Sequence, residues 1–419
     1  MKLIDLKEGQ EAIIKNVTGE GAFRKRLLEM GVIRGEKIKV VRIIDRMNIG
    51  GPAIHCSLLT SRLNSEEFST ILITGQVCEF EGDMGYLLKR NDIKPVFIKR
   101  LKRNISFISD TIALWEIMKI IYKEKPDIIH THKSKAGLLG RLAAIILGVP
   151  VIVHTFHGHI FHSYFSKIKT KFFIIFERIL AMFTTKIIVI SKQQYQEICS
   201  IYKIAHSNKF QIIKLGFNFA PLLNSFQYQG ILRKKYNINE NEIIVGIVGR
   251  LACVKNHLMF LKAAKIILQQ RSNIKFFIIG DGELKQELTA YTGKLEISDN
   301  VFFTGWIKNS AKIYSDLDIV ALTSKNEGTP VTLIEAVVCQ KPVVATKVGG
   351  VIDIIQDKKN GLLVEPNNAE KFAQAIINII DNPGIFSKSV TKNSLQMQQN
   401  YGQKRLINDI ENLYRKLSK

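Results

Sequence analysis

Two glutamates and a short glycine-containing turn in the second half of the chain combine groups that can hold a diphosphate and a sugar. Glu327, Gly328 and Thr329 precede Pro330, and Glu335 lies inside the apolar stretch that follows. Proline suits the first turn of a helix, so this stretch is predicted to be a helix whose first N–H groups can bind an anion. A carboxylate can accept hydrogen bonds from the adjacent hydroxyls of a sugar or ribose. For one isolated glutamate, a helix cap or a solvated helix position explains the residue equally well.

A second group of residues follows the first predicted strand of the same half. Arg250 and Lys255 fall in the loop GRLACVKNH. Open α/β sheets bind ligands at the carboxyl ends of their strands, where Arg can grip phosphate with two hydrogen bonds and Lys adds a mobile charge. Gly280 and Gly282, in IIGDGEL, would let the backbone approach a flat base. Alternatively, Arg250 and Lys255 could be ordinary surface cations, and Gly280 and Gly282 could simply form a turn.

Histidines gather in the first half. Six of them lie close together in the sequence: His130, His132, His154, His157, His159 and His162. Such clusters can bind metal, but their spacing matches no standard site and no cysteine or acidic cluster accompanies them. The five cysteines are scattered without a CxxC pair. We therefore expect no metal site, no disulfide framework and no bound cofactor.

Two series of alternating strands and helices must position these residues. The first series of short apolar runs covers 38–44, 69–74, 94–99, 126–132, 149–155, 186–191 and 211–217. The second covers 243–249, 274–280, 300–305, 318–324, 341–347 and 361–366. Near-continuous apolar strands separated by helical patterns, such as 57–63, 108–124, 134–147 and 169–183, predict parallel sheets covered on both faces.

This alternation predicts an α/β fold with two doubly wound, Rossmann-like domains facing a cleft. The expected divisions are an N-terminal domain over 37–215, a linker over 216–240, a second domain over 241–395 and a last helix within 396–419. Residues 1–36 stand outside the alternation and carry several glycines between short strands, which suggests a small β-rich segment.

The composition limits the partners. With 60 Lys+Arg against 37 Asp+Glu, the 419-residue chain has a formal charge of +23, which favours nucleic acid, an anionic membrane or phosphorylated substrates. A hydrophobic content of 46% is typical of a globular protein. No apolar run is long enough to cross a bilayer and the N-terminus has no signal-peptide pattern, so we expect a cytoplasmic protein.

Several motifs together resemble one enzyme family. GRLACVKNH, IIGDGEL, FTGW and the E-x7-E pattern from Glu327 to Glu335 follow MNIGGPA and the segment 127–166. In this order they resemble the retaining, nucleotide-sugar-dependent glycosyltransferases of family 4, most closely the bacterial members that build surface polysaccharides. The resemblance covers 38–415 and implies a GT-B fold. It also implies transfer of a sugar, from a UDP-sugar by preference, to a lipid-linked or polysaccharide acceptor.

The resemblance implies that the second domain holds the donor. Arg250 and Lys255 would neutralise the diphosphate as the leaving group gains charge. Glu327 would contact the donor sugar and Glu335 the ribose, while Gly328 and Thr329 would bind a phosphate. Catalysis would then rest on positioning and charge stabilisation, without a protein nucleophile.

The N-terminal domain would supply the opposite wall of the cleft. His157 would reach the donor sugar, and Gly50 and Gly51 would let the first loop approach the donor or acceptor. QIIKLGFNF stands where many members have an asparagine-glycine-valine turn, which is a departure from the family pattern.

A segment of the N-terminal domain combines aromatic and basic residues. The aromatic ones are Phe161, Tyr164, Phe165, Phe172, Phe173, Phe176 and Phe183, and the basic ones are Lys167, Lys169, Lys171, Arg178 and Lys186. This mixture favours the surface of an anionic bilayer, although at least half of the aromatic side chains could face the core. We expect a peripheral protein on the inner face of the plasma membrane, with no nucleic-acid partner.

The first 41 residues resemble the first half of the SH3-like domain of the ferrous-iron-transport A family, with GEGAFRKRLLEMG as the distinctive part. The strand IKVVRII is expected to belong to the parallel sheet instead. Two alternatives to the transferase stay open: a nucleotide-sugar epimerase of GT-B fold, and a basic regulatory or binding protein that uses this N-terminal segment.

Overall fold

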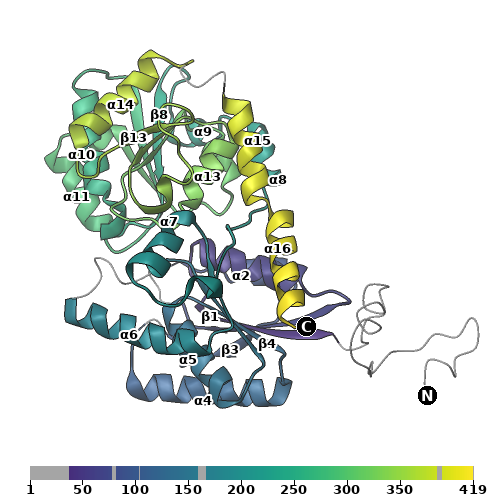
Figure 1. The fold of residues 1–419 in the computed structure, drawn as a ribbon. Coiled ribbons are helices and arrows are strands. Elements are labelled where there is room, and N and C mark those ends of the chain that lie inside the picture. The colour runs from purple at the N-terminus through teal and green to yellow at the C-terminus, as the bar shows by residue number, and fades with distance from the viewer. Residues whose placement is uncertain (1–36, 78–81, 103, 159–166, 385–388, 419) are drawn as a thin grey trace, which may run out of the picture.

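The structure is a computed structural model that describes residues 37–77, 82–102, 104–158, 167–384 and 389–418. The described chain forms two α/β domains, one above the other in Figure 1. The expected SH3-like segment over 1–36 lies outside the described residues. Among the helices described, none combines the length and the apolar character needed to cross a membrane.

The N-terminal domain is built on a seven-stranded parallel sheet with the strand order β3-β2-β1-β4-β5-β6-β7. Its strands are β1 (Ile38–Arg46), β2 (Phe68–Gly75), β3 (Val96–Ile98), β4 (Ile128–His132), β5 (Val151–Phe156), β6 (Lys186–Val189) and β7 (Phe210–Ile212). The central strands are almost wholly buried, as expected for a sheet covered on both faces. β1 pairs in parallel with β2 and with β4, which confirms that IKVVRII belongs to this sheet.

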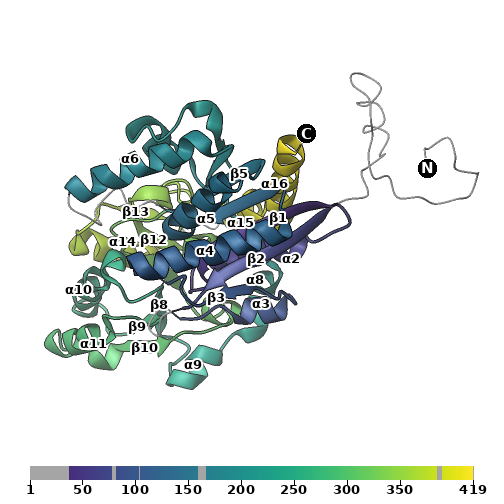
Figure 2. The same ribbon diagram turned by 90° about the horizontal axis from the view of Figure 1, so that it is seen from below.

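Helices cover both faces of this sheet (Figure 2). They are α2 (Gly51–Arg62), α3 (Tyr86–Arg90), α4 (Phe107–Glu124), α5 (Ser134–Ile146), α6 (Lys167–Phe183) and α7 (Lys192–Tyr195). Two glycines bring α5 close to the sheet. A Cβ at Gly137 would lie 2.5 Å from the His154 ring, and one at Gly140 would lie 2.7 Å from the Thr131 methyl group.

The C-terminal domain has a six-stranded parallel sheet with the order β10-β9-β8-β11-β12-β13. Its strands are β8 (Ile243–Val248), β9 (Ile274–Ile279), β10 (Val301–Gly305), β11 (Ile319–Leu322), β12 (Val343–Thr346) and β13 (Leu362–Val364). The helices are α8 (Ala220–Leu223), α9 (Ile231–Tyr236), α10 (His257–Leu268), α11 (Lys285–Lys294), α12 (Ala311–Tyr314), α13 (Val331–Val338) and α14 (Ala369–Asp381). Every strand expected from the sequence is present, and each sheet is parallel.

The last part of the chain returns to the N-terminal domain. The expected C-terminal helix is two helices, α15 (Val390–Tyr401) and α16 (Gln403–Leu417), separated at Gly402. They run down one side of the molecule in Figure 1. α16 adds Leu406, Ile410, Leu413 and Tyr414 to a buried cluster with residues of β1, α2 and β4. The Tyr414 hydroxyl lies 2.6 Å from Nδ1 of His130 and accepts a hydrogen bond of 3.4 Å from the buried Arg42.

Candidate active site

A large cavity lies between the two domains, with a volume of about 1340 Å³. Both domains line it, through the loops that leave the carboxyl ends of their strands. Seven of the residues predicted to contact the donor line this cavity: Gly50, Gly51, Arg250, Lys255, Glu327, Thr329 and Glu335. The structure therefore brings together residues that lie up to 285 positions apart in the sequence (335 − 50).

Lys255 and Glu327 form an ion pair on the C-terminal wall. Lys255 comes from the short helical turn after β8, and Glu327 from the loop after β11. Nζ of Lys255 lies 2.6 Å from Oε1 of Glu327, and the hydroxyl of Ser324 donates a 2.5 Å hydrogen bond to the same oxygen. Glu327 is thus held at the cavity edge by two partners, rather than acting as a helix cap. Ser324 carries no signal in the sequence beyond its place after a strand.

A pair of glycines missed by the sequence argument supports the loop of Glu327. The N–H of Gly350 donates a 2.9 Å hydrogen bond to the carbonyl of Glu327. A Cβ at Gly350 would lie 1.7 Å from the carbonyl oxygen of Gly328, and one at Gly349, where φ is +43°, would lie 2.1 Å from that of Glu327. Only residues without a side chain fit here, which the adjacent glycines of KVGG could have indicated.

The backbone before α13 carries unused hydrogen-bond donors: Thr329 lines the large cavity and Gly328 lines the second, smaller pocket beside Lys255 and Glu327. Among the described residues, the N–H groups of Gly328 and Thr329 donate no hydrogen bond, and the Thr329 hydroxyl is buried without a partner. The helix begins at Val331 and Pro330 occupies the N-cap with ψ of 98°, so the proline stands just before the first turn and not within it. Unpaired N–H groups at a helix start favour an anion.

Glu335 lies in α13 with one carboxylate oxygen in contact with a tyrosine. The Tyr314 hydroxyl donates a 3.0 Å hydrogen bond to Oε2 of Glu335. Burial raises the pKa of Glu335 to about 7, while the hydrogen bonds from Tyr314 and Ser310 oppose this shift. Glu335 is therefore not an ordinary solvated helix residue, and its charge changes near neutral pH.

The N-terminal wall is built around the start of α2. Gly51 faces the other domain, since a Cβ there would lie 3.4 Å from a methyl group of Val331. Lys133, which the sequence argument did not single out, also lines the cavity. Its Nζ lies 2.6 Å from Oδ1 of Asn48 and 3.1 Å from Oδ1 of Asp45, and burial lowers its pKa.

Gly280 and Gly282 are explained by packing of the loops themselves. A Cβ at Gly280 would lie 1.9 Å from the carbonyl oxygen of Gly249, and one at Gly282 would lie 2.6 Å from that of Leu251. These glycines allow the loop after β9 to pack against the loop after β8. Their contact with a donor base stays a prediction.

His157 lies where the two domains meet. Its carbonyl oxygen would be 3.0 Å from a Cβ at Gly328. With Lys255 and Glu327 it lines a second pocket of about 180 Å³. Its ring points into the N-terminal domain, where Nε2 lies 3.1 Å from Nδ1 of His132. Burial lowers the pKa of His157 well below its usual value, so the ring is neutral.

The other histidines predicted from the sequence differ in what their rings contact. His130 contacts Tyr414 and Thr155 through its two ring nitrogens, and His154 contacts Thr131. His159 and His162 lie outside the described residues. His132 and His157 join His55, a residue of α2 that the sequence argument did not include, in a group whose ligand atoms lie within 4.8 Å of one another. Within the part of the chain that the structure describes, these three residues form the group that could hold a metal ion.

Comparisons with known proteins identify the family. Residues 229–405 match the Glycosyl transferases group 1 family and residues 49–220 match Glycosyltransferase Family 4. Residues 1–73 match the FeoA domain, a match that extends through β1 and α2 into β2.

Two curated relatives cover most of both domains. A UDP-Gal:alpha-D-GlcNAc-diphosphoundecaprenol alpha-1,3-galactosyltransferase of Escherichia coli is 32% identical over 326 residues, which is 76% of this chain and 82% of the relative. The capsular polysaccharide biosynthesis glycosyltransferase CapM of Staphylococcus aureus is 25% identical, over 79% of this chain and 87% of the relative.

Solved structures have the same fold. Anabaena HepE, solved in complex with UDP and glucose, matches with a TM-score of 0.76 at 19% identity, over 90% of this chain and 99% of HepE. The apo lipopolysaccharide outer core galactosyltransferase WaaB matches with a TM-score of 0.65 at 18% identity, over 90% of this chain and 99% of WaaB. The fold, the ordered motifs and these matches together establish that the chain belongs to the family 4 glycosyltransferases of GT-B fold.

Proposed function

We propose that this glycosyltransferase moves a sugar from a UDP-sugar to a lipid-linked or polysaccharide acceptor in cell-surface glycan synthesis, with retention of anomeric configuration. One observation carries the proposal: the Lys255–Glu327 pair lines both pockets between the domains, and the residues with unpaired N–H groups beside it, Thr329 and Gly328, line the large and the small pocket respectively. A diphosphate and a sugar hydroxyl need these two kinds of group, side by side. The UDP and undecaprenyl-diphosphate in the names of the relatives support the choice of donor and acceptor.

In the proposed reaction, negative charge would develop on the departing diphosphate, close to Lys255 and Arg250. The acceptor oxygen forms a bond to the anomeric carbon as the bond from that carbon to the diphosphate breaks, and the acceptor proton passes to the departing phosphate oxygen. Lys255, Arg250 and the N–H groups before α13 would stabilise the growing negative charge. Lys255 would exchange Glu327 for phosphate, which frees the Glu327 carboxylate to accept hydrogen bonds from the sugar.

The other predicted contacts complete the donor site. Glu335 would bind the ribose hydroxyls, and its raised pKa makes this contact sensitive to pH. His157 would contact the donor sugar from the N-terminal side, through the pocket that it shares with Lys255 and Glu327. Gly50 and Gly51 would lie against the donor or acceptor.

We further propose that the N-terminal domain docks on an anionic membrane. α6 exposes a run of large apolar side chains: Ile168, Phe172, Ile175, Phe176, Ile179, Met182 and Phe183. Three of its four described aromatic residues are therefore exposed, and only Phe173 packs toward the core. Lys169 and Lys171 are exposed on the same helix.

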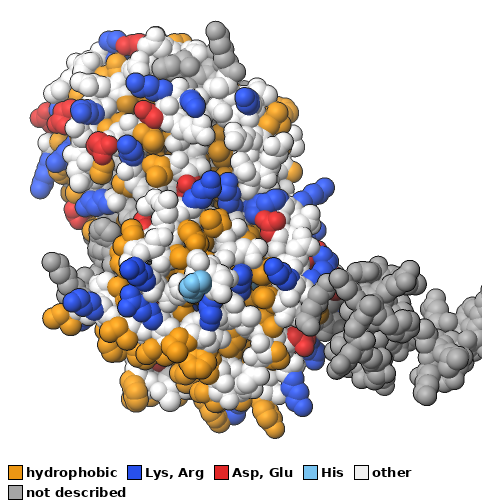
Figure 3. Space-filling model, viewed as in Figure 1, with side chains coloured by type: hydrophobic (Ala, Val, Ile, Leu, Met, Phe, Trp, Pro, Cys, Tyr) orange, Lys and Arg blue, Asp and Glu red, His pale blue; other side chains and the backbone are white. Residues whose placement is uncertain are grey.

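The apolar surface extends to the start of α4. Ile105, Phe107 and Ile108 are among the most exposed apolar residues, with Phe107 at 87% exposure. Hydrophobic side chains gather on the lower domain in Figure 3, in the region of α4 and α6, with Lys and Arg around them. Apolar insertion together with attraction to acidic headgroups favours a lipid surface.

A transfer assay with a donor-only arm tests the proposed reaction. Purified protein is incubated with UDP-, GDP- and ADP-sugars, with and without a short-chain lipid-diphosphate N-acetylglucosamine acceptor. We expect a new α-linked disaccharide only with the acceptor and a UDP-sugar. Conversion of the donor without any acceptor would favour the epimerase instead. Absence of transfer from every donor to any lipid-linked acceptor would contradict the proposal.

A further inference from the structure

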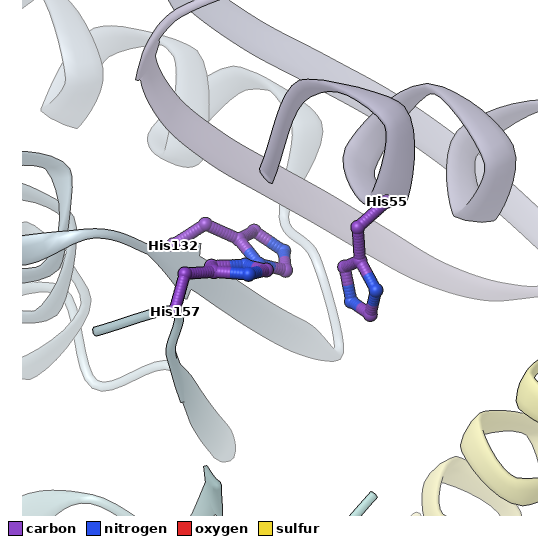
Figure 4. A group of neighbouring side chains, drawn as sticks. All are labelled: His55, His132 and His157. Atoms are coloured by element: carbon purple, nitrogen blue, oxygen red, sulfur yellow. The ribbon is translucent and has the colours of Figure 1, made fainter. Parts of the chain in front are cut away.

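Three histidine side chains from three separate elements converge inside the N-terminal domain. His55 comes from α2, His132 from the end of β4 and His157 from the residue after β5. Figure 4 shows the three rings turned toward one another. One ligand nitrogen from each lies within 4.8 Å of the others.

These rings lack the hydrogen-bond partners that buried imidazoles usually have. His55 is 1% exposed and neither of its ring nitrogens has a partner, and the same holds for Nε2 of His132 and Nδ1 of His157. A buried polar group without a partner destabilises the fold, because its hydrogen bonds to water are lost and not replaced. The neighbouring His130 has partners at both nitrogens, whereas Nε2 of His154 and both nitrogens of His257 also lack one. What distinguishes His55, His132 and His157 is that their rings also converge.

A metal ion between the rings would bind one nitrogen of each, including a nitrogen of His55 that has no hydrogen-bond partner. Neutral imidazole is a good ligand for Zn²⁺ and similar ions, and three histidines with one open position are a recurrent zinc site. We propose that His55, His132 and His157 bind a divalent transition-metal ion, with Zn²⁺ as the leading candidate. Of the three proposed ligands, only His157 also belongs to the proposed donor site. The inference therefore goes beyond the proposed function.

The distances between the ligand nitrogens match a tetrahedral zinc site after a small movement of one side chain. Zn–N bonds of about 2.0–2.1 Å in a tetrahedron place neighbouring ligand atoms roughly 3.3 Å apart. Nδ1 of His132 and Nε2 of His157 are already 3.1 Å apart. His55, whose ring makes edge contacts with both others at centroid distances of 5.5 and 5.0 Å, would need to approach by up to about 1.5 Å.

Nearby charges determine the fourth ligand. The buried guanidinium of Arg42 acts electrostatically on His55 and His132, and Lys133 acts on His157. Three neutral ligands leave the full charge of the ion facing these cations. The site therefore favours an ion whose open position carries an anion, such as hydroxide or a phosphate oxygen.

The bound ion would connect the domain to the cavity. It would fix α2, which begins at Gly51, to the segment that carries His157 against Gly328. His157 would then reach the donor sugar through its backbone, at the pocket that it shares with Lys255 and Glu327, while its ring binds the ion. Metal binding and sugar transfer can be measured separately, so failure of either proposal leaves the other testable.

Cobalt and zinc binding to the full chain test this inference. Protein purified without a histidine tag is freed of metal by dialysis against chelator, then titrated with Co²⁺ and followed by its visible absorption, with Zn²⁺ as the competitor. His55→Gln keeps a polar side chain of similar length but removes the imidazole. His257→Gln is the matched control, since His257 in α10 is also buried and also lacks partners at both nitrogens.

We expect the wild-type chain and His257→Gln to bind one Co²⁺ with tetrahedral absorption bands, displaced by Zn²⁺, and to unfold at a higher temperature with Zn²⁺. His55→Gln should lose at least about 100-fold in affinity and show no thermal shift. A folded wild-type chain without stoichiometric uptake, or equal uptake by folded His55→Gln, would overturn the proposal. If His55→Gln does not fold, His132→Gln replaces it in the same titration.

Discussion

Nζ of Lys255 lies 2.6 Å from Oε1 of Glu327, and the side chains of both residues are largely shielded from solvent. Each residue follows a different strand of one sheet, and Gly328 and Thr329 come directly after Glu327 in the sequence. This pair keeps an ammonium group and a carboxylate together at the place where the proposed reaction separates charge.

Replacement of either member of the pair should reduce transfer strongly. We expect Lys255→Ala and Glu327→Gln to lower kcat/KM by about 100- to 1000-fold, the loss typical of removing one preorganised electrostatic contact. Circular dichroism and thermal unfolding would show whether the fold persists. The matched control is Lys265→Ala, which breaks the exposed pair with Glu296 and should leave transfer within about twofold. Full activity in a folded Lys255→Ala enzyme would refute the site assignment.

A methyl group at Gly350 should disturb the loop of Glu327. The added Cβ would lie 1.7 Å from the carbonyl oxygen of Gly328, so the loop must move. We expect Gly350→Ala to raise the KM for donor by at least about tenfold and to destabilise the fold by about 1–3 kcal/mol. Gly293→Ala is the control, because a Cβ there meets no atom within 4 Å. It should leave KM unchanged and stabilise α11 slightly. Equal behaviour of the two variants would contradict the packing argument.

Glu335 should make stability depend on pH. Burial raises its pKa from 4.5 in the reference state to about 7 in the fold. The folded protein therefore holds a proton that the unfolded chain releases. Its stabilising contribution is complete below pH 4.5 and is lost as pH rises through 7.

Glu335→Gln should remove this dependence because the amide mimics the protonated acid. Between pH 5 and 8 we expect the free energy of unfolding of the wild-type chain to fall relative to Glu335→Gln, by up to roughly 3 kcal/mol. Urea unfolding at both pH values measures this difference. Glu370→Gln, at an exposed position in the first turn of α14, should follow the wild-type chain. A parallel pH dependence in all three proteins would rule out the buried acid as its source.

Charge on the exposed face of α6 should weaken membrane binding. We expect Phe172→Glu combined with Phe176→Glu to reduce cosedimentation with vesicles containing anionic lipid by at least about tenfold, since each change removes apolar insertion and adds repulsion. Phe226→Glu, at an exposed position of the C-terminal domain, serves as control and should bind as the wild-type chain does. Equal binding of all variants would exclude α6 as the docking surface.

The sheets could be predicted from the sequence because buried parallel strands are nearly continuous β-branched runs. The placement of Lys255 and Glu327 follows from the same rule, since both come directly after such strands. Their direct contact does not follow, because it depends on β8 and β11 being neighbours in the sheet. Strand order is a property of the assembled fold and leaves no local pattern.

The histidine cluster was missed for a related reason. His55 lies in a helical stretch, far in sequence from His132 and His157, and nothing in its local pattern marks it as a partner. Its approach requires α2 to cover the end of β4 beside β5. Lys133 and Ser324 were missed because single polar residues after strands are common. For α16, amphipathic spacing indicates a buried face but not which domain buries it.

The return of α16 to the first domain affects how the protein is made. The N-terminal sheet is fully synthesised by β7, yet a hydrophobic cluster on one of its faces is completed only by Leu406, Ile410, Leu413 and Tyr414. At ribosomal rates of about 5–20 residues per second, that interval lasts roughly 10–40 s. Until α16 has been made, the apolar side chains that it buries have no cover from it, and Arg42 lacks its Tyr414 partner. The last helix to be translated therefore completes the core of the domain that was translated first.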